Sequence, residues 1–386
     1  MRKLDLRGGS TVIRRAENQS SEKGAHMQED NIRSLNVNQM IDLLSTAYIS
    51  LIHNGTPFSA FPSVMLWGPP GVGKSQGVRQ IAECITAETG RTVAITDVRL
   101  LLFNPVDLRG IPTANADKTL AVWLKPNIFQ MDESPETVNI LFLDEISAAP
   151  PSVQAAAYQI TLDRMIGEHK LPENCIVIAA GNRVTDKSVA YNMPKALANR
   201  LCHLGIIGDP RAWHDWAVRS GLHRFVVGYL DFNPVALMRF EPSGTDLAFP
   251  TPRSWEMVSS ILKNISEDFS IVFPLVAGCV GEDAARAIRT WSLREDNLPS
   301  PKAIFAGNSR TRPNSVEMRT ALRCALVEYA HNHPDPDGLA HSLEHACELP
   351  WEYRKALLWD YSQIPAVREA IRNNPIYREA LRRGLQ

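Results

Sequence analysis

A glycine-rich segment close to residue 70 contains the residue types that hold nucleotide phosphates. It fits the pattern G-x4-G-K-[ST], with Lys74 followed by Ser75. Glycines let backbone N–H groups turn toward phosphate oxygens, and the start of a following helix adds positive charge. In this chemistry the lysine contacts the β- and γ-phosphates and the serine ligates Mg²⁺. The pattern therefore predicts an ATP site made of Gly68, Pro69, Pro70, Gly71, Val72, Gly73, Lys74, Ser75 and Gln76.

Two carboxylates, Asp144 and Glu145, follow a second apolar run about 70 residues later. Ligands of open α/β sheets bind at the carboxyl ends of the strands, and two acids placed there require a cation. Asp144 is predicted to ligate Mg²⁺, and Glu145 to orient, or take a proton from, the water that attacks the γ-phosphate. Taken alone, the pair is also compatible with a solvated strand end.

A short amide and two arginines complete the candidate catalytic side chains. Asn182 ends the next apolar run, where an amide can orient a water without adding charge, although Gly-Asn alone usually marks a turn. Arg200 precedes the last apolar run, and Arg253 stands at the start of a predicted helix. An isolated arginine is usually a surface residue. A cation directed at a transferring phosphoryl group, however, accelerates the reaction, and such enzymes recruit one from a neighbouring subunit.

These side chains need a scaffold that brings several strand ends together. Helical spacing of apolar residues begins at Val37, and further helices are predicted over 74–89 and 151–165. Apolar strands that alternate with helices indicate a parallel sheet covered on both faces. We therefore expect an α/β fold whose five-stranded parallel sheet contains Val64–Trp67, Val93–Thr96, Ile140–Leu143, Ile176–Ala179 and Leu204–Ile207.

The composition of the chain changes along its length and suggests four regions. Residues 1–35 are polar and without apolar periodicity, and Gly24–Met27 resembles a cloning remnant before a second start methionine. Residues 36–208 are expected to form the α/β nucleotide-binding core. After that, proline-punctuated helical stretches predict a small helical lid over 209–265 and a helical C-terminal region over 266–386.

Overall composition excludes several classes of protein. Lysine and arginine total 41 against 42 acidic residues, so no overall positive field favours nucleic acid or an anionic membrane. No apolar run is long enough for a bilayer span, and no leader follows the basic start, which predicts a cytoplasmic protein. The six cysteines are scattered without a Cys-x-x-Cys pair, which argues against a zinc ribbon or a disulfide framework.

A histidine cluster near the C-terminus is the main alternative site. His341 and His345 are one helical turn apart, a spacing that can chelate zinc, but no glutamate-bearing HExxH motif is present. Surface histidines are therefore the preferred interpretation of His331, His333, His341 and His345.

Together these motifs resemble those of an AAA+ ATPase of the MoxR type, over roughly residues 36–265. The resemblance equates the glycine-rich loop with Walker A and Leu141–Ile146 with Walker B. It likewise equates Asn182 with sensor 1, Arg200 with the arginine finger and Arg253 with sensor 2. The segment from Asn104 to Pro126 resembles the insert that projects toward a central pore in this family. The resemblance implies ATP and Mg²⁺ as cofactors, a ring that is most often hexameric, and a protein partner with a von Willebrand factor A domain.

One segment departs from the family pattern. The family usually has Asn-Arg-Ala-Pro after the Walker B acids, whereas this chain has Ile146-Ser147-Ala148-Ala149-Pro150. An arginine often found there is missing, and Arg164 is a candidate to reach across a subunit interface instead.

Three functions are compatible with these residues. The first is a chaperone-like remodelling ATPase that acts on a protein partner. The second is a motor or loader for DNA or RNA, against which the near-neutral net charge argues. The third is a nucleotide-dependent switch without useful turnover, which the presence of Lys74, Asp144, Glu145 and Asn182 disfavours.

Overall fold

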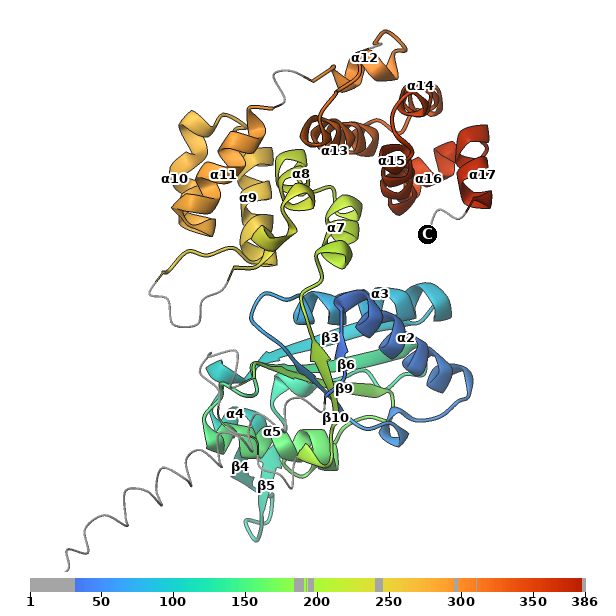
Figure 1. The fold of residues 1–386 in the computed structure, drawn as a ribbon. Helices are drawn as coiled ribbons and strands as arrows, with labels where there is room; N and C mark the ends of the chain where they lie inside the picture. The colour runs from blue at the N-terminus through green and yellow to red at the C-terminus, as the bar shows by residue number, and fades with distance from the viewer. Residues whose placement is uncertain are drawn as a thin grey trace, which may run out of the picture. The chain divides into compact units, whose positions relative to one another are not determined.

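The computed structural model describes residues 32–183, 191, 193, 198–239, 246–294, 298–309 and 311–383. The chain divides into two compact units. An α/β unit ends at Ile207, and a helical unit starts at Gly208 and includes the loop residues Gly71–Gly73 (Figure 1). Each unit is described by itself below.

The α/β unit is built on a six-stranded parallel sheet in the order β1-β10-β2-β9-β6-β3. All five predicted apolar runs form strands, which confirms the fold class. The number of strands was wrong by one, because Ser34 and Leu35, assigned to the polar tail, pair with β10 at the edge of the sheet. The strands are β1 Ser34–Leu35, β2 Val64–Trp67, β3 Thr92–Arg99, β6 Thr137–Asp144, β9 Cys175–Gly181 and β10 Cys202–Ile206.

Helices cover both faces of this sheet, with α2 (Val37–His53) and α3 (Lys74–Thr89) on one side and α5 (Pro151–Asp163) on the other (Figure 1). Seven successive residues of β6 are buried, as expected for a parallel strand between two helical layers. Helices α2 and α3 pack so closely that a Cβ on Gly77 would lie 2.3 Å from the Met40 Cε. A larger residue at this position would require the flexible end of the Met40 side chain to move.

Two small hairpins extend from the α/β unit. Strands β4 (Ile111–Ala114) and β5 (Ala121–Leu124) form one, after the short helix α4 (Pro105–Arg109), and β7 (Met165–Ile166) and β8 (His169–Lys170) form the other. The Trp123 N–H donates to Glu168 Oε1 at 2.9 Å, and the Trp123 carbonyl oxygen lies 2.8 Å from His169 Nε2. These two hydrogen bonds tie the hairpins together.

The helical unit has one apolar core to which helices from α7 to α17 contribute. Six of its helices have a proline in their first turn, where no intrahelical N–H is needed, so the prolines start these helices rather than break them. The helices are α7 Pro210–Arg219, α8 Arg224–Phe232, α9 Pro252–Asn264, α10 Phe269–Val280, α11 Glu282–Ser292, α12 Pro301–Phe305, α13 Val316–Asn332, α14 Pro336–Cys347, α15 Trp351–Gln363, α16 Pro365–Ile371 and α17 Pro375–Arg382.

Within the described ranges, no group of three or more acidic, histidine or cysteine side chains could hold a metal ion. His345 is buried and lies 3.0 Å from the Thr311 carbonyl oxygen through Nε2, so its assignment to the surface was wrong. Nor does any helix of the described part have the length and apolar character to cross a membrane.

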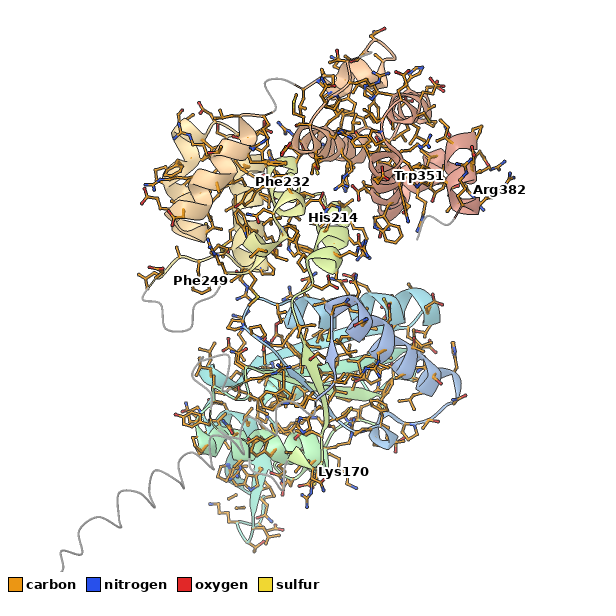
Figure 2. The ribbon with its side chains drawn as sticks, viewed as in Figure 1. Lys170, His214, Phe232, Phe249, Trp351 and Arg382 are labelled. Atoms are coloured by element: carbon orange, nitrogen blue, oxygen red, sulfur yellow. The ribbon has the colours of Figure 1, made fainter. Side chains whose placement is uncertain are left out.

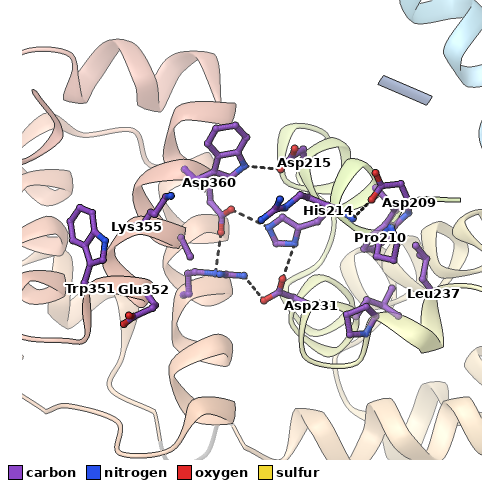
Figure 3. Close-up of a pocket in the computed structure, with 17 residues that line it drawn as sticks. Asp209, Pro210, His214, Asp215, Asp231, Leu237, Trp351, Glu352, Lys355 and Asp360 are labelled. Atoms are coloured by element: carbon purple, nitrogen blue, oxygen red, sulfur yellow. Dashed lines mark hydrogen bonds and ion pairs between the residues drawn. The ribbon is translucent and has the colours of Figure 1, made fainter. Parts of the chain in front are cut away.

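A cluster of four charged or titratable side chains joins α7, α8, α13 and α15 beside a cavity of about 990 Å³ (Figure 3). His214 Nε2 lies 3.0 Å from Asp360 and its Nδ1 lies 3.6 Å from Asp231, while Arg323 contacts both carboxylates at 3.1 and 2.5 Å. Figure 2 shows His214 on α7 and Trp351 on α15 among the side chains of this unit. Removing one member would leave a buried charge uncompensated, which is strongly destabilising.

Replacing His214 with glutamine is expected to reduce the pH dependence of the helical unit's stability. Burial alone would lower the pKa of His214, but Asp360 raises it above its usual value. The protonated ring therefore contributes stability below the unfolded pKa of about 6.5, and this contribution is lost as the pH rises through the folded value. Urea unfolding, followed by tryptophan fluorescence across this pH range, measures the effect. An unchanged pH slope in the variant would contradict the assignment.

Candidate active site

The glycine-rich loop connects β2 directly to α3, as its sequence predicts. A Cβ at Gly68 would lie 2.4 Å from the Ile206 carbonyl oxygen, so the loop starts with a close approach to β10. Gly71 and Gly73 have φ values of +76° and +104°, which other residues rarely adopt. Gly68 is therefore required because a side chain would clash, and Gly71 and Gly73 because of their backbone conformation. This conformation lets the N–H groups that precede α3 face a phosphate.

Lys74 is buried at the start of α3 and surrounded by oxygen atoms. Its ammonium group donates to the carbonyl oxygens of Gly68 at 2.6 Å and Pro69 at 3.1 Å, and to Asn182 Oδ1 at 3.1 Å. The structure thus brings together Lys74 and Asn182, which are 108 residues apart in the sequence. A buried ammonium that donates to these neutral oxygens keeps its positive charge and is suited to bind a phosphate.

Ser75 and Asp144 also meet, at the adjoining strand end. The Ser75 hydroxyl donates to Asp144 Oδ2 at 2.8 Å, and Asp144 Oδ1 accepts the Glu145 N–H at 2.8 Å. A hydroxyl and a carboxylate are hard oxygen donors of the kind that Mg²⁺ uses together with water and phosphate oxygens. These two residues therefore fit the predicted metal, although the described residues offer no all-protein cage for it.

Glu145 adopts a left-handed backbone conformation with φ +59°. This conformation costs a non-glycine residue about 1–2 kcal/mol, and such strain often marks a functional position. The turn is held by the Ala148 N–H, which donates to the Glu145 carbonyl oxygen, and by the Ile146 N–H, which donates to Ala180. The half-buried carboxylate makes no hydrogen bond or ion pair with any described residue. It can therefore accept a proton from a water.

Ser147 is a residue of this site that sequence reasoning missed. Its buried hydroxyl accepts the Asn182 N–H at 2.9 Å, and a Cβ on Gly181 would lie 2.7 Å from the same oxygen. Ser147 thus fixes the backbone that presents the Asn182 amide. The signal in the sequence was its place in the segment that departs from the family pattern.

Asp97 is a third acid at this edge of the sheet, and the sequence did not single it out. It lies on β3, one strand from Asp144, in a stretch predicted to end at Thr96. Partial burial, and then the nearby Asp144 carboxylate, raise the pKa of Asp97 above its usual value. Asp97 and Asp144 thus lie close enough for their carboxylates to repel each other, and a cation bound between the strand ends would relieve this repulsion.

The three arginines lie in different surroundings. Arg200 is exposed in the turn before β10, and Arg253 is exposed at the second residue of α9 in the helical unit. Arg164 ends α5 in a left-handed conformation and donates to the carbonyl oxygen of Cys175 in its own α/β unit. One guanidinium nitrogen of Arg164 is thus engaged within its own fold, and its reach across a subunit interface stays a prediction.

Comparison with known proteins bears on the α/β unit. Residues 63–203 match the family described as ATPase family associated with various cellular activities (AAA). No curated protein matches the sequence. This family match shows that the α/β unit contains an AAA ATPase domain, and the chain is an ATPase.

Two solved structures are similar to the chain at a low level. A RuvB mutant from Thermotoga maritima is 15% identical, with 68% of this chain and 72% of that chain covered and a TM-score of 0.34. NtrX from Brucella abortus in complex with ADP is 13% identical, with coverages of 97% and 74% and a TM-score of 0.35. At such TM-scores neither likeness carries an argument about the site.

Replacing Glu145 with glutamine is expected to separate ATP binding from hydrolysis. The amide cannot take a proton from water, so turnover should fall by about 10²-fold or more, while ATP affinity stays within a few-fold. Lys74→Ala should instead lose binding, because it removes the buried ammonium. Equilibrium binding of a fluorescent ATP analogue and steady-state phosphate release measure the two effects. Hydrolysis by the glutamine variant at the parent rate would refute the role of Glu145 as base.

Proposed function

We propose, from the AAA ATPase domain at residues 63–203, that the chain is a MoxR-type, ring-forming ATPase that remodels a protein partner in the cytoplasm. The observation that carries the proposal is the β4–β5 hairpin, which exposes large apolar side chains. Leu120, Ile111 and Leu124 are 67%, 63% and 58% exposed. Apolar side chains gathered on one surface mark a site of interaction with another protein.

The charge of the hairpin favours a protein partner over nucleic acid. Lys118, in the hairpin turn, is the one basic residue between Pro112 and Leu124. Binding to a phosphate backbone requires several cations, which this segment lacks. Beside the hairpin, a cavity of about 500 Å³ is lined mainly by apolar residues, Val106 and Ile128 among them, together with Asp107 and Lys125. The resemblance in sequence makes a von Willebrand factor A domain protein our candidate partner.

Ring assembly is supported by the position of Arg200. Its side chain is exposed and makes no hydrogen bond or ion pair within the described part of the chain. A cation in a defined turn, with no described residue of its own subunit to neutralise it, is suited to contact the γ-phosphate held by a neighbouring subunit. A closed ring gives every subunit such a neighbour, and the resemblance suggests six subunits.

In the proposed mechanism each residue has one task. Lys74 binds the β- and γ-phosphates, Glu145 takes a proton from the attacking water, and Asn182 orients that water. Ser75 and Asp144 would hold Mg²⁺, which neutralises phosphate charge when bound. Arg200 acts on the neighbour's nucleotide. Arg253 would respond to the nucleotide from the helical unit of the same chain, as sensor 2 does in the family it resembles.

Mixing two inactive variants tests the trans role of Arg200. Arg200→Ala lacks the finger and Glu145→Gln lacks the base, so each alone should be inactive. In mixed rings, an Arg200→Ala subunit receives an intact finger from a Glu145→Gln neighbour, and part of the ATPase activity should return. The measurement is phosphate release from rings shown by light scattering to contain both subunits. Absence of recovery in such rings would contradict the trans assignment.

Substitutions in the hairpin test the protein-partner role. Leu120→Ser and Trp123→Ala should leave basal ATPase activity and assembly unchanged, but should abolish stimulation by the partner. Leu293→Ser is a matched control, since Leu293 is 61% exposed and lies in the helical unit. ATPase assays with a purified von Willebrand factor A domain protein provide the readout.

Two results would count against this role. Unfolding of both hairpin variants would show that these side chains are structural. Stimulation of the ATPase by DNA or RNA that falls steeply with added salt would support the nucleic-acid alternative.

A further inference from the structure

The turn that presents Arg200 is fixed by contacts at both of its ends. The Leu201 N–H donates to the Ala198 carbonyl oxygen at 3.3 Å and closes the turn around Arg200. Leu201 is buried, and the next N–H, that of Cys202, donates to the Ser63 carbonyl oxygen at 3.0 Å. The arginine side chain is thus exposed while the backbone beside it is anchored to the sheet.

His203 adds a second hydrogen bond to the same carbonyl oxygen. Its Nε2 lies 2.7 Å from the Ala198 oxygen, and its Nδ1 lies 2.8 Å from the Trp67 indole nitrogen. An indole N–H can only donate, so Nδ1 of His203 must accept, and the proton of the neutral ring resides on Nε2. The Trp67 indole therefore selects the one tautomer of His203 that can donate to Ala198.

Trp67 connects these hydrogen bonds to the phosphate loop. Its ring stacks on His203, with centroids 6.1 Å apart and an interplanar angle of 19°. Trp67 is the last residue of β2, and the next residue, Gly68, accepts a hydrogen bond from Lys74 through its carbonyl oxygen. An indole, an imidazole and a carbonyl group therefore connect the start of the phosphate loop to the turn around Arg200.

We infer that His203, in the tautomer imposed by Trp67, is a positioning residue that fixes the Arg200 turn for catalysis in the neighbouring subunit. The inference rests on the proposed trans role of Arg200. Neither ring contacts reacting atoms in this scheme. They act through geometry, because a displacement of about 1 Å in a group that contacts a transition state can cost about 10²-fold in rate.

Two substitutions interrupt this series of contacts at different points. His203→Phe keeps an aromatic ring against Trp67 but removes both hydrogen bonds, whereas Trp67→Phe keeps the stacking and removes only the donor that selects the tautomer. Trp216→Phe is the matched control, since this half-buried indole in the helical unit makes no hydrogen bond to a described residue. Trp67→Phe also keeps the inference testable if His203→Phe fails to fold, which circular dichroism would reveal.

Rings of either variant should lose about 10- to 100-fold in kcat, while KM for ATP changes less than about 3-fold, because the nucleotide's own site is intact. In an Arg200→Ala background, either substitution should have no further effect on the residual rate, since it acts only through the arginine. The control should match the parent in both constants.

Mixed rings locate the defect. When His203→Phe subunits are mixed with Glu145→Gln subunits, activity should return, because the second subunit supplies an intact finger to the first subunit's site. If the mixture stays inactive while the Arg200→Ala and Glu145→Gln mixture recovers, His203 acts on its own phosphate loop, and the inference is overturned with the ring proposal intact. Parent-like kcat in both single variants would also overturn it. If neither mixture recovers, the trans role of Arg200 fails, and this inference fails with it.

Discussion

The hydrogen bonds of the buried Lys74 ammonium are the interaction on which the rest of the site depends. An ammonium group cannot be buried without oxygen partners, and here they come from Gly68, Pro69 and Asn182. Such a set requires that the ends of β2 and β9 be neighbours, which the strand order provides. The same order places β6 next to β9, so that Asp144 reaches Ser75 one residue beyond the lysine.

The sequence predicts this architecture well wherever a strand is apolar throughout. Residues of β6 and β9 are buried on both faces, and the second half of β6 and nearly all of β9 appear in the sequence as apolar runs followed by polar residues. Edge strands give weaker signals. Ser34 and Leu35 form a strand of two residues at one edge, which is too short to show a periodicity of apolar residues. At the other edge, β3 contains several exposed residues, so only part of it appears in the sequence as an apolar run.

Parts of the site escape prediction because they depend on contacts between distant segments. Ser147 matters only because Asn182 lies beside it, and His203 only because Trp67 is its diagonal neighbour in the register of β2 and β10. For Arg164 the sequence could not reveal that the left-handed end of α5 turns the guanidinium toward Cys175. The buried cluster around Arg323 joins helices up to 146 residues apart, which no local pattern shows.

The central claim is that one subunit's Arg200 completes the ATPase site of the next, so that the isolated chain is catalytically incomplete. The most direct measurement is the ATPase rate per subunit over a wide range of protein concentration, with sedimentation velocity on the same samples. The account predicts that the rate per subunit rises together with the assembled fraction, and that Arg200→Ala assembles without this rise. A rate per subunit that is the same for the monomer and the assembly would contradict it.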